Sequence, residues 1–113
     1  MKLRALLAAA VVALSLVVAS SADARVRLVS VTSPINHGAY ATFVAAVSPS
    51  RTCSITVNYK SGPSRAKGLY PKRPINGRVS WRWKVGTNTT PGRWPITVSC
   101  GSAGTLHTSF VVT

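Results

Sequence analysis

Two stretches of the chain alternate apolar and polar residues, and each has a cysteine at one end. Over residues 53–60 the odd positions are apolar and the even positions polar, whereas over 94–100 the even positions are apolar or aromatic. A repeat of two residues is typical of a β-strand that buries one face. Both stretches are therefore predicted to be strands with one face in a hydrophobic core.

The two predicted strands match each other when they are laid antiparallel with Cys53 opposite Cys100. In that register the remaining apolar residues fall in three cross-strand pairs, namely Ile55 with Val98, Val57 with Ile96 and Tyr59 with Trp94. Residues directly opposite each other lie on the same face of a sheet. The register therefore places every large apolar side chain of both strands on one face.

The rest of the chain after residue 24 also shows strands and turns, with no helical period. The expected strands are 25–32, 39–47, 53–60, 78–85, 93–100 and 106–112, separated by turns rich in Pro and Gly. Segment 61–77 is the longest irregular stretch, and within it a short edge strand is expected around 66–70. Strands of this length between such turns indicate an all-β fold, either a sandwich or a small barrel. We expect one domain without internal repeats.

Residues 1–24 are predicted to be a secretory signal peptide. Lys2 and Arg4 form a basic head, residues 5–19 an apolar run, and Ala22-Asp23-Ala24 a small-x-small cleavage pattern. The run has about 15 residues, fewer than the roughly 20 that a membrane-spanning helix needs, so cleavage is favoured over an uncleaved anchor. We expect cleavage near Ala24, a domain over 25–113, and a location in the periplasm, at the cell surface or outside the cell.

Charge narrows the function further. The chain has 14 Lys and Arg residues against one acidic residue, Asp23, and a formal net charge of +13. Without the predicted signal peptide, 12 basic residues and no Asp or Glu remain. Mg²⁺ and Ca²⁺ sites, carboxylate general acids and Asp-oriented triads all need carboxylates. We therefore expect no enzyme, no metal and no cofactor, and a positive field that attracts polyanions or merely keeps the protein soluble.

The cysteines and histidines support a structural interpretation. Two cysteines in a small exported domain predict one disulfide, Cys53–Cys100, with a Cα separation of about 4.4–6.8 Å. Closing its loop of about 48 residues would stabilise the fold by roughly 4 kcal/mol in the chain-entropy treatment. His37 and His107 are far apart in sequence and lack the spacing of zinc ligands, so both are expected to be solvated.

A family resemblance supports the all-β assignment. Residues 77–85, Gly-Arg-Val-Ser-Trp-Arg-Trp-Lys-Val, and 90–98, Thr-Pro-Gly-Arg-Trp-Pro-Ile-Thr-Val, resemble the last hairpins of bacterial secreted immunoglobulin-like (Ig-like) domains. The resemblance extends over 25–113 and implies an Ig-like antiparallel β-sandwich of six to seven strands. It places the third, fifth and sixth expected strands in one sheet and the first, second and fourth in the other. The disulfide would then join neighbouring strands of one sheet, and no binding residue is implied.

Aromatic residues and a basic segment are the candidates for a site. Trp81, Trp83 and Trp94 fall on apolar faces and are expected in the core, the alternative being a stacking platform for sugars or bases. Tyr70 is expected either exposed or tucked against the sandwich edge. Residues 60–78 hold half of the basic charge that remains after cleavage. The candidate polyanion-binding residues are Lys60, Arg65, Lys67, Tyr70, Lys72, Arg73, Arg78, Arg82 and Lys84.

Two functions from different classes remain open at this point. The first is a stand-alone exported module that binds anionic envelope or extracellular polymers through the basic segment, because loops on a rigid sandwich often carry binding. The second is a structural or protein-partner module, such as a secreted subunit or inhibitor, that docks through sheet edges or the long loop. A further alternative for the loop itself is that it is solvated and its like charges only keep a sheet edge from pairing. Binding that weakens with salt would favour the first, and a protein partner captured regardless of salt would favour the second.

Overall fold

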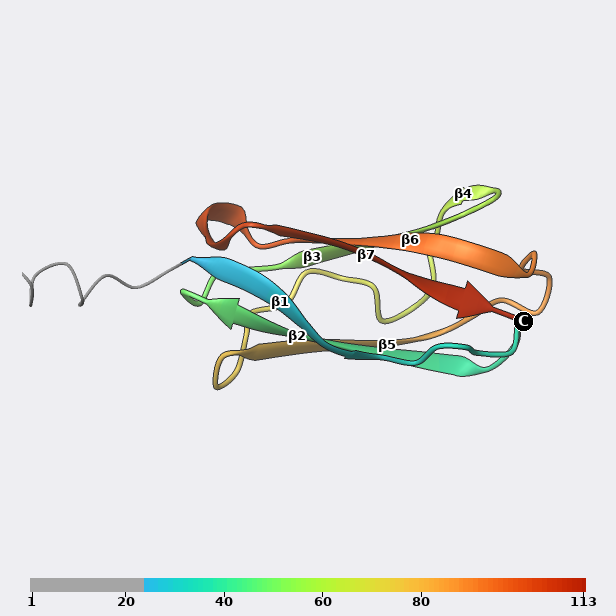
Figure 1. Cartoon of the computed structure of the whole chain (residues 1–113), viewed down its shortest axis with the longest axis horizontal. Helices are drawn as coiled ribbons and strands as arrows, with labels where there is room; N and C mark the ends of the chain where they lie inside the picture. The colour runs from blue at the N-terminus through green and yellow to red at the C-terminus, as the bar shows by residue number, and fades with distance from the viewer. Residues whose placement is uncertain (1–23) are drawn as a thin grey trace, which may run out of the picture.

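The strands lie close to where the alternation predicts them. A computed structural model describes residues 24–113, which form seven β-strands and a short 3₁₀ helix, η1 (Gly101–Ala103) (Figure 1). The strands are β1 (Arg25–Val31), β2 (Tyr40–Ser48), β3 (Ser54–Tyr59), β4 (Gly62–Pro63), β5 (Arg78–Lys84), β6 (Gly92–Ser99) and β7 (Thr105–Val112). The predicted signal peptide falls almost wholly on residues 1–23, outside the described residues, so it stays a prediction.

The strands form two facing antiparallel sheets, with the orders β1-β2-β5 and β4-β3-β6-β7 (Figure 1). The third, fifth and sixth expected strands correspond to β3, β6 and β7, and the first, second and fourth to β1, β2 and β5. This is the division that the Ig-like resemblance implies. The chain therefore adopts an Ig-like β-sandwich fold.

The predicted register between β3 and β6 is confirmed. It pairs Ile55 with Val98 and Val57 with Ile96. Cys53 and Cys100 form a disulfide beside these pairs, with their Cα atoms 4.1 Å apart. The separation is slightly shorter than expected because the backbone N–H of Cys53 points away from β6 and donates to the Lys72 carbonyl. Cysteines so placed form a non-hydrogen-bonded pair, in which Cα atoms approach to about 4.5 Å.

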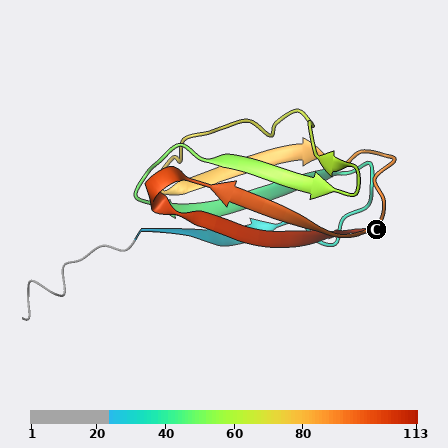
Figure 2. The ribbon, with the colours of Figure 1, turned by 90° about the horizontal axis from the view of Figure 1, so that it is seen from above.

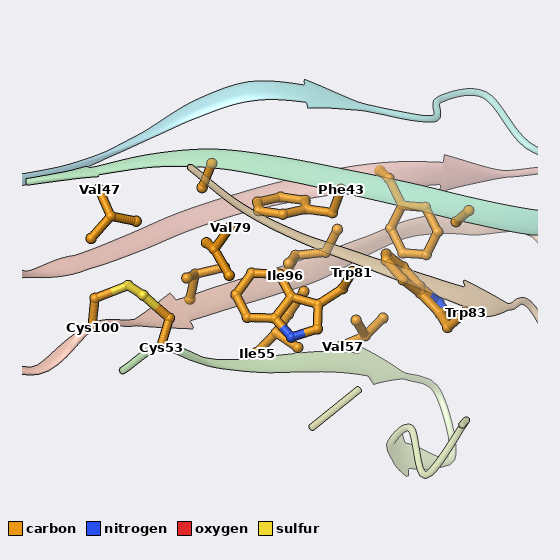
Figure 3. Close-up of a cluster of buried hydrophobic side chains, with 14 of the residues drawn as sticks. Phe43, Val47, Cys53, Ile55, Val57, Val79, Trp81, Trp83, Ile96 and Cys100 are labelled. Carbon is orange, nitrogen blue, oxygen red and sulfur yellow. A yellow bond between two sulfur atoms is a disulfide. The ribbon is translucent and has the colours of Figure 1, made fainter. Parts of the chain in front are cut away.

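Two of the tryptophans form the centre of the core. Trp81 and Trp83 are 1% and 0% exposed, and Figure 3 shows both reaching inward from β5. Trp83 Nε1 donates to the hydroxyl of Tyr59 at 3.1 Å, and Trp81 Nε1 donates to the backbone carbonyl of Tyr70. These two rings are therefore core residues and not a stacking platform. Trp94 is half-buried and packs against the core from the start of β6.

The described sandwich carries its own core. Its buried hydrophobic residues all lie between Ile35 and Val112, and its strands begin at Arg25. A protein that begins at Arg25 therefore keeps every described strand, the disulfide and the complete described core. This form is used in the experiments proposed below.

One expectation about the long irregular segment is wrong. No strand forms around 66–70, and the additional strand is instead β4, whose two residues pair with the end of β3. We call residues 64–77, between β4 and β5, the basic loop. Figure 2 shows it running along the side of the sandwich between β3 and β5. Separate hydrogen bonds to both sheets, described next, hold the loop in place of a continuous ladder.

Candidate polyanion-binding surface

The basic loop is fixed against the open edge of β5. The φ angle of Gly68 is +98°, and a Cβ atom at this position would lie 2.1 Å from the carbonyl oxygen of Arg82. Two residues further on, the carbonyl of Tyr70 accepts a 2.8 Å hydrogen bond from Trp81 Nε1. A glycine is therefore required for the close approach, and a buried tryptophan holds the loop in place.

The second half of the loop is attached to both sheets. Lys72 exchanges two backbone hydrogen bonds with Cys53, of 2.7 and 2.9 Å, which attaches the loop to the start of β3. The Lys72 side chain crosses to the other sheet, where Nζ donates to the carbonyl of Ser80 at 2.8 Å. Ile75 and Arg78 then exchange backbone hydrogen bonds where β5 begins. The backbone that carries Lys72 and Arg73 is therefore fixed to both sheets.

Tyr70 is the exposed aromatic that the sequence suggested. Its side chain is 57% exposed, and Lys72 Nζ lies 5.2 Å from the ring centroid. The side chain of Tyr70 is therefore exposed, while its backbone carbonyl is held by Trp81. The residue is both an exposed aromatic and a point at which the loop is attached to the sandwich. An ammonium group has three donors, and only one of those on Lys72 is used by Ser80. Lys72 therefore keeps donors for a ligand.

The sheet β1-β2-β5 is the lower one in Figure 1. Its outer face carries two rows of cations with an uncharged row between them. In register, Arg27 is opposite Ala46 and Ala46 is opposite Arg78, so the three form one line across the sheet. We call this outer face, together with residues 72–75, the basic face. The outward side chains of its strands are Arg25, Arg27 and Ser30 on β1, Tyr40, Thr42, Val44, Ala46 and Ser48 on β2, and Arg78, Ser80, Arg82 and Lys84 on β5.

A depression lies where the basic loop meets this sheet. It has a volume of about 340 Å³, and its cations are Lys72, Arg73 and Arg78. Uncharged side chains complete the lining, among them Val44 and Ile75. Residues 24–113 contain no Asp or Glu, so no side-chain carboxylate of the described chain neutralises these cations. The depression is thus suited to an anionic group from outside the described chain.

The opposite outer face differs in chemistry. The outward positions of β3, β6 and β7 are mainly Ser and Thr, and Arg93 is their single basic residue. Its Nη1 donates to the hydroxyl of Ser109 at 3.1 Å. The described sandwich therefore has one cationic outer face and one nearly neutral outer face.

The structure brings together most, though not all, of the candidate residues predicted from sequence. Lys72, Arg73, Arg78, Arg82 and Lys84 gather on the basic face, with Tyr70 beside Lys72. Arg65 and Lys67 are exposed on the first part of the basic loop. Lys60 is apart from these, at the far end of β3 from Cys53, where it lines a separate groove of about 640 Å³ with Tyr59 and residues 86–90.

Three charged or aromatic residues of the basic face were not among the candidates predicted from sequence. Arg25 and Arg27 alternate with the half-buried residues of β1, and Tyr40 begins the outward row of β2. The alternation of positions 25–28 was a signal for the two arginines. Their place beside the β5 cations was not visible, because it depends on how β1, β2 and β5 are ordered in the sheet.

Other kinds of site find little support in the described part of the chain. Within residues 24–113 no three His, Cys, Asp or Glu side chains are grouped so that they could hold a metal ion. His37 and His107 are both exposed, as expected. A search of the same residues finds no helix with the length and apolar character needed to span a membrane.

Comparison with known proteins adds a likeness to a solved structure. No protein-family model and no curated protein matches the chain. It is similar to a crystal structure of the titin domains Z1Z2 in complex with telethonin, with 15% identity and a TM-score of 0.49. The match covers 81% of this chain and 48% of the other, so this chain spans about half the length of that one. The Ig-like assignment made above rests on the strand order of the sandwich itself.

Proposed function

We propose that this chain is an exported bacterial Ig-like module that binds anionic polymers of the cell envelope or the extracellular medium through its basic face. The observation that carries the proposal is the uneven placement of charge. Nine of the 12 basic residues of 25–113 lie on the outer face of β1-β2-β5 or in the basic loop. The other three are Arg51, Lys60 and Arg93. Export rests on the predicted signal peptide.

The spacing of the cations supports binding to a repeated anion. Outward residues of one strand recur about every 6.6–6.8 Å, and neighbouring strands are about 4.8 Å apart. Arg82 and Lys84 are successive outward residues of β5, and Arg27 and Arg78 are separated by one intervening strand. Guanidinium groups also bind phosphate, sulfate or carboxylate with two parallel hydrogen bonds. A chain of such anions would make several contacts at once on this face.

Salt dependence tests the proposal. A fluorescent anionic oligomer is titrated against the protein beginning at Arg25 at several salt concentrations, and the affinity should fall steeply as salt rises. Replacing Lys67, Lys72 and Arg73 by Gln should flatten the log–log slope by about two to three, because each phosphate contact contributes roughly 0.7–0.9. Lys67 and Arg73 are exposed charges that contribute little to folding. Lys72→Gln loses the hydrogen bond to the Ser80 carbonyl, so the thermal midpoint should fall slightly.

The result can also contradict the proposal. Equal slopes for the two proteins would show that the basic loop is not part of the contact surface. Absence of binding to any anionic oligomer at physiological salt, with capture of one protein partner that survives high salt, would instead favour the protein-partner function.

A further inference from the structure

The basic face contains apolar surface that binding to a polymer of charges does not require. Between its two rows of cations, Val44 and Ala46 point outward from β2 and are partly exposed. At the edge, Ile75 is 77% exposed, the largest exposure among the large hydrophobic residues of the described chain. The apolar side chains thus lie among the cations and not apart from them.

The exposure of Ile75 follows from a well-fixed backbone. Ile75 and Arg78 exchange backbone hydrogen bonds of 2.8 and 3.1 Å across a tight turn. Asn76 and Gly77 form that turn with positive φ angles of 53° and 76°. The turn therefore presents the Ile75 side chain to solvent as part of the folded structure, beside the cations Arg73 and Arg78. Val44 lines the same depression, so the two apolar side chains and the cations share one surface.

We propose that the anion this face takes is the surface of an anionic lipid layer, with phosphate headgroups on the cations and Ile75 and Val44 against the acyl region. This inference rests on the proposed function for the use of the basic face, and it assigns that face a lipid layer in place of a soluble polymer. An apolar patch rimmed by cations suits an interface that is charged at its surface and apolar just below it. Lys and Arg side chains suit the rim, because their stems bury against apolar surface while their charges stay at the headgroups.

The two outer faces make the docking direction specific. The face of β3, β6 and β7 presents mainly hydroxyl side chains, with one cation, Arg93, opposite one outward valine, Val111. A single cation cannot form a rim around an apolar patch, so this face does not suit the role. Docking through the basic face would leave the hydroxyl-rich face in water. A soluble polyanion, in contrast, gains nothing from Ile75 or Val44, which separates the two ligand classes experimentally.

The test compares vesicles with a soluble polyanion. The protein beginning at Arg25 is used, because the apolar run of the predicted signal peptide would itself bind lipid. Binding is measured by co-flotation with phosphatidylcholine vesicles, with and without phosphatidylglycerol, and by titration with dextran sulfate. The double variant Val44→Thr/Ile75→Thr keeps every charge. The control Val111→Thr makes the same change at an outward, partly exposed position of β7 on the opposite face.

The double variant should bind anionic vesicles about tenfold more weakly, the effect of withdrawing on the order of 50–60 Å² of apolar surface from the lipid. Its affinity for dextran sulfate should stay within about twofold of the parent, as should both affinities of Val111→Thr. Vesicles of phosphatidylcholine alone should not bind. Ile75→Thr alone, which changes only a loop residue, should show part of the loss and guards against misfolding of the double variant.

The possible failures are distinguishable. Unchanged vesicle affinity in the double variant, or equal binding to vesicles without phosphatidylglycerol, would overturn the lipid inference. Binding to dextran sulfate without binding to anionic vesicles would overturn it while leaving the proposed function intact. Binding to neither ligand would overturn both.

Discussion

The guanidinium carbon of Arg82 lies 4.5 Å from the centroid of the Tyr40 ring, across two neighbouring strands. The register places Tyr40 directly opposite Lys84, so Arg82 reaches the ring diagonally. Such a cation–π contact contributes about 0.5–1 kcal/mol at an exposed site. It positions one cation of the basic face without using any of its hydrogen-bond donors, so a ligand could still accept from them.

Replacing Tyr40 tests whether this positioning matters for binding. Tyr40→Thr should lower the affinity for an anionic oligomer by about two- to fivefold, the equivalent of losing roughly 0.5–1 kcal/mol. Tyr40→Phe keeps the ring and should bind within about twofold of the parent. Isothermal titration of both variants against the same oligomer checks this. A loss of equal size in Tyr40→Phe would assign the effect to the hydroxyl and contradict the cation–π account.

The approach of the basic loop to β5 gives a second prediction. Gly68→Ala should destabilise the fold more than Gly62→Ala, although both glycines have positive φ angles, +98° and +112°. Both substitutions carry a backbone cost of about 1–2 kcal/mol, because alanine disfavours a positive φ angle. Only at Gly68 would the added Cβ collide with the carbonyl of Arg82, since nothing lies within 4 Å of the Cβ position at Gly62.

Urea denaturation and limited trypsin digestion measure the difference between these two variants. Displacement of the loop in Gly68→Ala should free the backbone around the exposed Lys67 and speed cleavage after it. Gly62→Ala should be cleaved there at the rate of the parent. Equal destabilisation and equal cleavage would show that the loop is not held against β5 as described.

We expect the stability of the fold to depend on pH through Tyr59. Burial raises the pKa of Tyr59 above its ordinary value of 10.0, and the hydrogen bond from Trp83 offsets part of that rise. The unfolded chain then loses the phenol proton at lower pH than the folded chain does. The folded state therefore keeps its full stability below about pH 10 and loses stability as the pH rises toward the folded-state pKa.

Comparison with Tyr59→Phe isolates the contribution of Tyr59 to the pH dependence of stability, because the two proteins differ at that residue alone. At pH 8 the variant should be less stable by about 1–3 kcal/mol, since the indole N–H of Trp83 loses its acceptor. The gap between the two proteins should narrow at pH 11. Chemical denaturation at the two pH values measures it, and a gap that stays constant would mean that Tyr59 titrates alike in the folded and unfolded chains.

The β3–β6 pair was predictable because independent signals agreed. Alternation of period two identified each strand, and the cysteines at opposite ends allowed only one register that kept all apolar residues on one face. The same logic placed Trp81 and Trp83 in the core. For these elements the local pattern and the tertiary contacts demand the same arrangement.

The basic loop and the basic face could not be predicted in the same way. The backbone of Gly68 against Arg82, and the Tyr70 carbonyl at the indole of Trp81, are contacts between separate segments that leave no periodic signal. An edge strand was therefore expected where single contacts hold the chain instead. Lys60 was grouped with the loop cations by its sequence position, although β3 separates it from Lys72 in space.

The most direct test of the account compares two variants of equal net charge. One replaces Arg78, Arg82 and Lys84 on the basic face by Gln, and the other replaces Arg51, Lys60 and Arg93, which lie elsewhere. The measurement is the slope of log affinity against log salt concentration for one anionic oligomer, with thermal unfolding as the check on folding. The account predicts a slope smaller by about two to three for the basic-face variant and by less than about one for the other. Equal changes in the two slopes would contradict it, because the charge would then act as a property of the whole surface without a localised site.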